Sequence, residues 1–245
     1  MIGTGAIASA RFLDEKAVKF NGTNQLLTIP NHPYMADTQG AWSFWFKLDT
    51  LLSAPGLKML VSADMFSGGT QVINIGLRRN AALGSGTFVD ITIVNPTVRA
   101  GSGTAVPITA GTTYHVVYGS DANLYINGVL VTLVSWVYPL PTAGTWYSSL
   151  VGGTGRSIAV AGNYRPPTSV NWADVAINDM VYYNTPLTAG EVTEVYAAGK
   201  RTNPNRWTAT LRAKIKSFYP FENSLNDKIG AQNWTAIGSP TYVTP

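Results

Sequence analysis

The sequence predicts an all-β protein, a jelly-roll sandwich of two antiparallel sheets with one short helix near residues 188–198. Three observations predict this fold class. The 245 residues include 12 Tyr, 8 Phe and 7 Trp but only four glutamates, a composition that favours strands over helices. Gly (24) and Pro (14) supply turn signals along the chain. Between these signals, short apolar or alternating runs recur at a spacing typical of β-sandwiches.

The first expected strands are residues 16–20 and 25–29. Asn21-Gly22-Thr23-Asn24 lies between them and has a turn composition, so we expect a hairpin. In the next strand, every second residue from Trp42 to Leu48 is large and apolar, which indicates one buried face. Trp45 falls on the other, mostly polar face, and we expect a loop to cover it.

A meander is predicted around Asn127-Gly128. Residues 114–118 alternate, residues 124–126 resume after a break, and residues 129–134 follow the Asn-Gly pair. Asn-Gly favours a two-residue type I′ hairpin because both central residues need a positive φ. Further strands are expected at residues 58–63, 72–77, 88–94, 158–161 and 178–183.

One segment has the pattern of a helix. Thr188 and Glu191 have the spacing of a capping box, in which each side chain accepts a hydrogen bond from the backbone N–H of the other residue. Val192, Val195 and Tyr196 then share one helical face, and the glycine at position 199 can end the helix. We therefore expect a short helix from Thr188 to about residue 198.

Several protein classes are excluded by composition. Cysteine is absent, so the fold does not depend on disulfides and lacks the thiolate ligands that structural zinc prefers. The first residues show neither the basic start nor the apolar run of a signal peptide. No stretch reaches the roughly 18 apolar residues of a membrane span. We expect a chain that is made in a cytoplasm and does not enter a membrane.

The net charge of +4 is unevenly distributed, because residues 200–216 contain six cations and no acid. One interpretation is a solvated connection whose cations also suit a helix C-terminus. The other is a docking surface for an acidic partner. No aromatic-interleaved basic motif accompanies the cations, which argues against nucleic acid. The six residues are Lys200, Arg201, Arg206, Arg212, Lys214 and Lys216.

Three stretches together resemble a known family. FNGTNQLLTIPN with AWSFWFKLD, then YHVVYGSDANLYINGVLV, then INDMVYYNTPLTAGEVTEVYAAG are similar to the successive signatures of laminin-G-like, concanavalin A-like lectin/glucanase domains. The similarity spans roughly residues 16–199, and its most specific part is the helix opening at Leu187 to Glu191. It implies a two-sheet jelly roll whose relatives bind glycans or proteins, in some cases with calcium, and in a minority hydrolyse polysaccharides.

The order of the signatures departs from the family pattern. Residues 218–243 look like the family's opening strand and turn, yet here they end the chain. We hypothesise that residues 218–245 close the sheet in the position of an N-terminal strand, within a single domain spanning residues 1–245 that begins with an arm at residues 1–15. The alternative is the start of a second repeat.

Catalytic residues are not apparent. The polysaccharide-cleaving relatives place acids on alternate residues of one strand, so that both carboxylates face the sugar. Here no glutamate has such a partner, and we predict no enzymatic activity. His115, in the middle of a strand, is better explained as a hydrogen-bonded packing residue than as a base. The glutamates are Glu15, Glu191, Glu194 and Glu222.

Calcium is the one metal for which the sequence offers ligands. Asp227, Asn233 and Asp179 could supply hard oxygen ligands if the tail folds back. The alternative, which we favour, is a turn at Asp227 stabilised by its own side chain and no cofactor.

Glycan recognition would use aromatic faces beside amides and carboxylates on loops. Two loop-rich stretches carry such residues, although packing under the loops explains aromatic residues equally well. The candidates are Trp136, Trp146 and Tyr147 in the first stretch, and Asn163, Tyr164, Trp172 and Asp174 in the second, where Asn171 is adjacent.

The leading hypothesis is a non-catalytic interaction module on the surface of a virion. It would be a phage decoration protein that docks on a capsid or tail protein, or on copies of itself, and presents its loops to host glycans. The missing export signal and the absence of cysteine favour it. The alternative is a freestanding carbohydrate-binding lectin, and a glycoside hydrolase is the third hypothesis.

Overall fold

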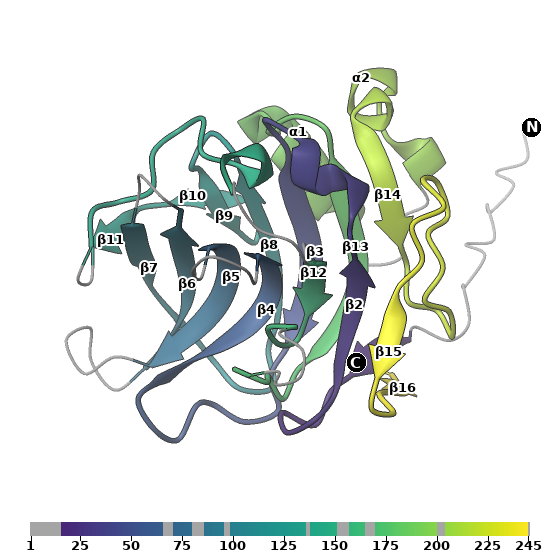
Figure 1. Ribbon diagram of the computed structural model, residues 1–245. Helices are drawn as coiled ribbons and strands as arrows, with labels where there is room; N and C mark the ends of the chain where they lie inside the picture. Colours follow the sequence, from purple (N-terminus) through teal and green to yellow (C-terminus); the bar gives the residue numbers. More distant parts are fainter. Residues whose placement is uncertain are drawn as a thin grey trace, which may run out of the picture.

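Two antiparallel sheets face each other across the core (Figure 1). In the computed structural model, the described residues are 16–65, 71–79, 86–95, 99–135, 138–150, 157–164, 170–199 and 204–244. Sheet A has the order β10-β9-β8-β3-β13-β1-β16, and β14 also pairs with β13. Sheet B has the order β11-β7-β6-β5-β4-β12-β2-β15. The predicted fold class, an all-β jelly-roll sandwich of two antiparallel sheets, is confirmed.

The strands are short and lie within or close to most of the expected ranges. Those of sheet A are β1 (Ala17–Lys19), β3 (Ala41–Lys47), β8 (Thr113–Gly119), β9 (Leu124–Ile126), β10 (Val129–Val131), β13 (Ala176–Tyr183), β14 (Ile215–Tyr219) and β16 (Thr241–Val243). Those of sheet B are β2 (Leu26–Pro30), β4 (Gly56–Met65), β5 (Gln71–Arg79), β6 (Thr87–Val94), β7 (Arg99–Ile108), β11 (Leu133–Ser135), β12 (Ser157–Val160) and β15 (Thr235–Ile237). The sequence analysis missed β7, whose glycines and proline weaken any strand pattern.

Alternation along the strands builds the core. Trp42, Phe44 and Phe46 of β3 point inward and are almost fully buried, as the sequence predicts. From sheet B, Ile73 and Ile75 of β5 pack into the same core. Burial of such side chains stabilises the sandwich by about 1.5–3 kcal/mol each.

The outer face of sheet A is also covered, here by helices. Helix α1 (Ala189–Ala198) and helix α2 (Ala209–Ala213) lie beside β13 and β14 in Figure 1. Val192 and Leu211 pack there with Val117 and Tyr183 in a second, smaller cluster. Because this face is covered as well, β13 and nearly all of β3 are buried on both sides.

Trp45 belongs to this covered face. Its ring stacks on that of Tyr196 in α1, with centroids 5.7 Å apart, and only 8% of Trp45 is exposed. The expectation that a loop covers Trp45 is therefore wrong, because a helix does.

The expected hairpin over residues 16–29 is also wrong. β1 lies in sheet A, between β13 and β16, whereas β2 lies in sheet B, between β12 and β15. The turn at residues 21–24 thus carries the chain from one sheet to the other. Turn composition marks a reversal of direction, but the strands that flank it need not pair.

The Asn127-Gly128 hairpin forms as predicted. Ile126 faces Val129 across the turn, and Asn127 and Gly128 have φ values of 52° and 80°. β9 pairs in turn with β8, as expected. The expected last strand, residues 129–134, is instead divided between β10 in sheet A and β11 in sheet B.

Helix α1 also forms where the sequence predicts it. Thr188 Oγ1 accepts a hydrogen bond from the backbone N–H of Glu191, and the Glu191 carboxylate accepts one from the N–H of Thr188. Gly199, at a φ of 75°, follows the last turn. Helix α2 and three 3₁₀ turns were not predicted: η1 (Pro33–Ala36), η3 (Tyr147–Ser149) and η4 (Pro204–Arg206). Among the described residues, no helix is both long and apolar enough to cross a membrane.

The C-terminal tail contributes strands to both sheets. β14 pairs with the second half of β13, placing Phe218 opposite Val181, while β1 pairs with the first half at Ile177. β15 then pairs with β2, and β16 with β1. Strands from the two ends of the chain therefore share one edge of β13. The single-domain interpretation stays a prediction, and its N-terminal arm, residues 1–15, lies outside the described residues.

Candidate functional site

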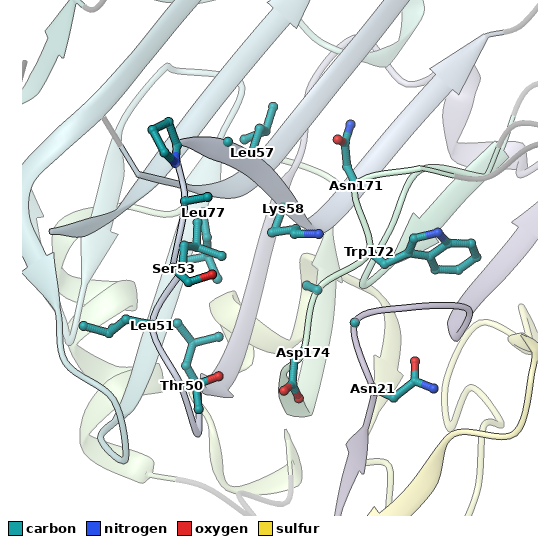
Figure 2. A pocket seen from close by; sticks show the side chains of 17 residues that line it. Asn21, Thr50, Leu51, Ser53, Leu57, Lys58, Leu77, Asn171, Trp172 and Asp174 are labelled. Carbon is teal, nitrogen blue, oxygen red and sulfur yellow. The ribbon is translucent and has the colours of Figure 1, made fainter. Parts of the chain in front are cut away.

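A cleft of about 530 Å³ opens at one end of the sandwich (Figure 2). Three connections form its walls: the turn between β1 and β2, the loop between β3 and β4, and the loop between β12 and β13. The first residues of β4 lie between these walls. Loops at the end of a rigid sandwich are a common location for binding sites, because the sheets hold them in place.

The loop from Thr50 to Pro55 forms an apolar wall. Its backbone is held from sheet B: Arg79 Nη1 of β5 donates to the carbonyl oxygens of Leu52 and Ser53, at 2.8 and 2.6 Å. The hydroxyl of Thr87 in β6 accepts a hydrogen bond from the N–H of Leu52. This wall is therefore attached to two strands.

The opposite wall carries Trp172, whose indole is half-buried. The preceding residue, Asn171, has a left-handed backbone with a φ of 58°. Its carbonyl oxygen accepts a hydrogen bond from the N–H of Met59 in β4, at 2.9 Å. Its side-chain amide donates to Asn163 Oδ1, also at 2.9 Å. Asn163 Nδ2 in turn donates to both carboxylate oxygens of Asp64, at 3.0 and 3.2 Å.

Asp64 and Asn163 are both fully buried. Buried polar groups are stable when they are hydrogen-bonded, and such a chain of bonds has few alternative arrangements. The chain from Asp64 through Asn163 to Asn171 therefore orients the backbone beside Trp172 before any ligand arrives.

Two glycines allow the walls to approach each other closely. Gly22, in the turn between β1 and β2, has a φ of 69°, and a Cβ there would lie 2.9 Å from the backbone nitrogen of Asp174. A Cβ at Gly162 would lie 3.2 Å from Cε3 of Trp172. A side chain at Gly22 would displace the backbone at Asp174, and one at Gly162 would require the Trp172 ring to shift by a few tenths of an ångström.

An ion cluster lies beside the cleft and includes Asp174 of its lining. Lys19 Nζ is 2.6 Å from Asp174 Oδ1 and 2.7 Å from Asp49 Oδ2. Burial disfavours the charge on Lys19, but the hydrogen bonds to the two carboxylates outweigh it and raise the pKa of Lys19. The hydrogen bond from Lys19 lowers the pKa of Asp49. This cluster connects the β3–β4 loop to the β12–β13 loop.

Lys58 of β4 differs from Lys19 in its partners. Figure 2 shows Lys58 between the two walls, and its side chain is half-buried. Among the described residues, no carboxylate lies within 4 Å of its ammonium group. The cleft therefore offers an aromatic face, amide and carboxylate groups, and one cation without an acid partner.

The structure separates the predicted glycan residues into three groups. Trp172 and Asp174 line the cleft, and Asn163 lies beneath it as a support. Tyr164 is half-buried and does not line the cleft. Trp136 lies outside the described residues.

Trp146 and Tyr147 are corrections to the prediction. Only 1% of each side chain is exposed, and both belong to the main core. Trp146 Nε1 donates to the hydroxyl of Tyr182 at 3.0 Å, and the hydroxyl of Tyr147 accepts from the indole of Trp42. Both polar groups are thus satisfied inside the sandwich, and neither ring can present a face to a sugar.

Two of the six cations in residues 200–216 form ion pairs with other parts of the chain. Lys214 Nζ lies 2.6 Å from the Glu191 carboxylate, and Lys216 Nζ lies 2.7 Å from that of Asp37. These two residues fix α1 and η1 and are not free cations of a docking surface. Arg206 and Arg212 are exposed, whereas Lys200 and Arg201 lie outside the described residues.

The three calcium candidates are used differently. The Asp227 carboxylate accepts hydrogen bonds from the hydroxyl of Ser217 and from the N–H groups of Phe218, Ile229 and Gln232. Asn233 accepts one from the N–H of Asp227, at 2.9 Å. Asp179 lies elsewhere, in a small cavity under α1. In the described part of the chain, no group of three or more His, Asp or Glu side chains could hold a metal ion.

His115 is fully buried, and its ring packs against those of both Trp45 and Tyr196, which also contact each other. Its Nε2 is hydrogen-bonded to the hydroxyl of Ser43 at 2.8 Å. Burial lowers the pKa of His115 to about 3, so the ring is neutral near pH 7. These contacts are those of a packing residue.

Lys58 and the apolar wall were not found in the sequence. The signal was weak but present: LLSAPGL, residues 51–57, is unusually apolar for a connection between strands. Lys58 itself was assigned to the first position of a strand, and nothing in the sequence places that position beside Trp172.

No protein-family model matches the sequence, and no curated protein matches it. The fold, in contrast, is similar to many solved structures. A proposed carbohydrate-binding protein from Bacteroides ovatus superposes with a TM-score of 0.62 at 14% identity, over 94% of this chain and 60% of that one. This chain thus spans 60% of the length of that neighbour.

Two further neighbours match over nearly their whole length. A heptameric SAP-like pentraxin from Limulus polyphemus has a TM-score of 0.58 at 13% identity, over 94% of both chains. The CBM40 of a Ruminococcus gnavus IT-sialidase, bound to α2,3-sialyllactose, has a TM-score of 0.55 at 16% identity. It covers 74% of this chain and 96% of that one. The chain has the concanavalin A-like jelly-roll fold of these proteins, while membership of the laminin-G family stays a prediction.

Proposed function

We propose that this chain is a non-catalytic carbohydrate-binding module and that the cleft beside Trp172 is its glycan site. The observation that carries the proposal is that half-buried Trp172 lines the cleft, directly after Asn171, whose position is fixed by hydrogen bonds that end on buried Asp64. Two of the fold neighbours support this proposal. One is described as a proposed carbohydrate-binding protein, and the other is bound to α2,3-sialyllactose.

The chemistry of the cleft suits a sugar ring. The apolar face of a pyranose packs on an indole, and its hydroxyl groups need donors and acceptors at the rim. Asp174 has one oxygen on Lys19 and a second that can accept from a hydroxyl, and the backbone of Asn171 is already fixed. A rigid site of this kind loses little conformational entropy on binding.

Glycoside hydrolysis fits the same cleft less well. Asp49 and Asp174 lie on either side of one ammonium group, which brings two carboxylates close together. A glycosidase, however, needs one carboxylic acid that stays protonated near neutral pH. Lys19 lowers the pKa of Asp49 and is ion-paired with Asp174, so this arrangement opposes an acid role.

The virion hypothesis receives no support from these neighbours. Two of them are described as carbohydrate-binding proteins and the third as a pentraxin. In addition, two of the six cations of the expected docking surface form ion pairs within the chain. The proposal therefore follows the alternative hypothesis from the sequence, a lectin-like module, and includes no capsid or tail partner.

Replacing Trp172 with Ala tests the site. We expect the affinity for a glycan selected on an array to fall at least about tenfold, equivalent to about 1.4 kcal/mol, because the stacking face is lost. Trp172→Phe should retain most of the affinity. Isothermal titration calorimetry measures both.

Tyr196→Ala is the matched control, since Tyr196 is another partly exposed aromatic residue, 37% exposed, but lies on α1 away from the cleft. It should bind the glycan as the wild type does. Equal affinities of the wild type and Trp172→Ala for the same glycan would show that the cleft is not the site.

A further inference from the structure

We infer that the cleft selects acidic sugars, which carry a carboxylate or sulfate group, and that Lys58 is the residue that recognises the anionic group. The inference rests on the proposed function, because it concerns the ligand of the same cleft. The inference goes further because it assigns the charge of the ligand and the residue that binds the charged group.

The acids beside the cleft have cationic partners. The two acids, Asp49 and Asp174, both bind Lys19, and Lys47 also lies near enough to Asp49 to lower its pKa. These two acids are thus balanced by two cations. A sugar carboxylate that approaches the cleft therefore meets little net repulsion from Asp49 and Asp174.

Two other cations have no such balance. Lys58 has no carboxylate within 4 Å among the described residues. Arg79 donates to the carbonyl oxygens of Leu52 and Ser53 behind the apolar wall, and it too has no carboxylate within 4 Å in the described part of the chain. Among the described residues that line the cleft, the charged ones are Lys58 and Asp174, and Asp174 is ion-paired with Lys19. Lys58 is thus the charged lining residue that has no partner of opposite sign, and a concave surface with low-dielectric walls strengthens its attraction for an anion.

The backbone places Lys58 beside the stacking residue. The N–H of Met59, the residue after Lys58, donates to the carbonyl oxygen of Asn171, the residue before Trp172, at 2.9 Å. Lys58 and Trp172 are therefore direct chain neighbours of the two residues that this hydrogen bond joins, which places their backbones close together. A sugar ring stacked on Trp172 would have its charged substituent within reach of the ammonium group.

Lysine carries its charge on a compact ammonium group at the end of a flexible side chain. It lacks the planar guanidinium group with which arginine forms two parallel hydrogen bonds to a carboxylate. Lys58 alone therefore selects for negative charge and does not distinguish carboxylate from sulfate. Both sources belong in the test, as separate arms.

The test begins with an array of neutral, carboxylated and sulfated oligosaccharides. We expect the wild type to bind members of the acidic arms and to show weaker binding to the neutral arm. For the acidic glycan that binds best, the neutral comparison is the same glycan with its acid converted to a methyl ester or with its sulfate removed. The neutral form should bind about tenfold less tightly, as expected for one charge-assisted hydrogen bond.

Variants then assign the effect to Lys58. Lys58→Met keeps the aliphatic chain and should lower the affinity for the acidic form about tenfold while leaving the neutral form unchanged. Lys58→Arg should retain the preference. Lys228→Met, on the exposed tail segment that follows β14, removes one positive charge elsewhere and is the matched control. Thermal melting of each variant confirms that it is folded.

Salt provides an independent readout. The affinity for the acidic form should fall as ionic strength rises, because salt screens a partly exposed charge. The same titration with Lys58→Met should show a smaller dependence.

Two failures can be told apart. Binding of neutral and acidic forms with equal affinity, or an unchanged preference in Lys58→Met, overturns the charge assignment and leaves the glycan site intact. Failure to bind any member of the array overturns the proposed function, and this inference with it.

Discussion

Buried polar side chains position the cleft and much of the core around it. Asp64 and Asn163 have no exposed surface, yet they determine where Asn171 lies. A single partner removed from such a chain leaves a buried group unsatisfied, which costs about 1–3 kcal/mol. At the residue scale, the site therefore depends on side chains that never touch a ligand.

The two histidines make stability depend on pH. Burial lowers the pKa of His32 and of His115 from 6.5 to about 3. Between these values the unfolded chain binds more protons than the folded one, so the free energy of unfolding decreases as pH falls below 6.5. We expect a lower value at pH 5 than at pH 7 in urea titrations, with a slope of up to about 1.4 kcal/mol per pH unit for each histidine.

His115→Gln is the comparison for this prediction, because an amide can keep the hydrogen bond to Ser43 but does not titrate. The slope should fall by about half. Burial raises the pKa of Asp90, and any contribution of this carboxyl to the slope has the opposite sign. A slope that is the same in the variant and the wild type would contradict the role of His115.

At the scale of elements, sequence patterns predict a turn or a helix start accurately where the hydrogen bonds that stabilise it join residues only a few positions apart. The Asn127-Gly128 turn and the α1 capping box are both of this kind. The turn at residues 21–24 shows the opposite case, since its strands pair with partners far away in the chain. Elements were therefore predicted better than their pairing.

Thr188→Ala tests the start of α1. The substitution removes one capping hydrogen bond and should lower the free energy of unfolding by about 1 kcal/mol, measured in urea. Thr193→Ala, on the exposed side of the same helix, is the control and should be neutral or slightly stabilising, because Ala is the better helix former. If the two variants are equally stable, the cap contributes nothing measurable.

At the scale of the whole molecule, the tail joins the two ends of the chain. β16 pairs with β1, β15 with β2, and β14 with β13, so the C-terminal segment contacts both sheets. Phe221 and Trp234 between these strands are buried in the main core. The sandwich is thus complete only when the last residues have been added.

Deletion of residues 235–245 tests this dependence. It removes β15 and β16 and exposes one backbone edge of β1 and one of β2, and unpaired edges promote association between chains. We expect a lower melting temperature and a shift to larger species in size-exclusion chromatography. Deletion of residues 244–245 alone keeps both strands and should leave both measurements unchanged. A monomer with the wild-type melting temperature after the longer deletion would show that the tail is dispensable.

The sequence by itself determined the fold class, the positions of most strands, the Asn127-Gly128 hairpin and the capped helix α1, because each depends on a period or a bond within a few residues. It also placed Trp172 and Asp174 among the candidates. Only the tertiary structure decided that Trp146 and Tyr147 are buried while Trp172 lines a cleft, and that Lys58 lies between the walls of that cleft. The physical reason is that exposure and proximity depend on contacts between strands far apart in the chain, which no local pattern records.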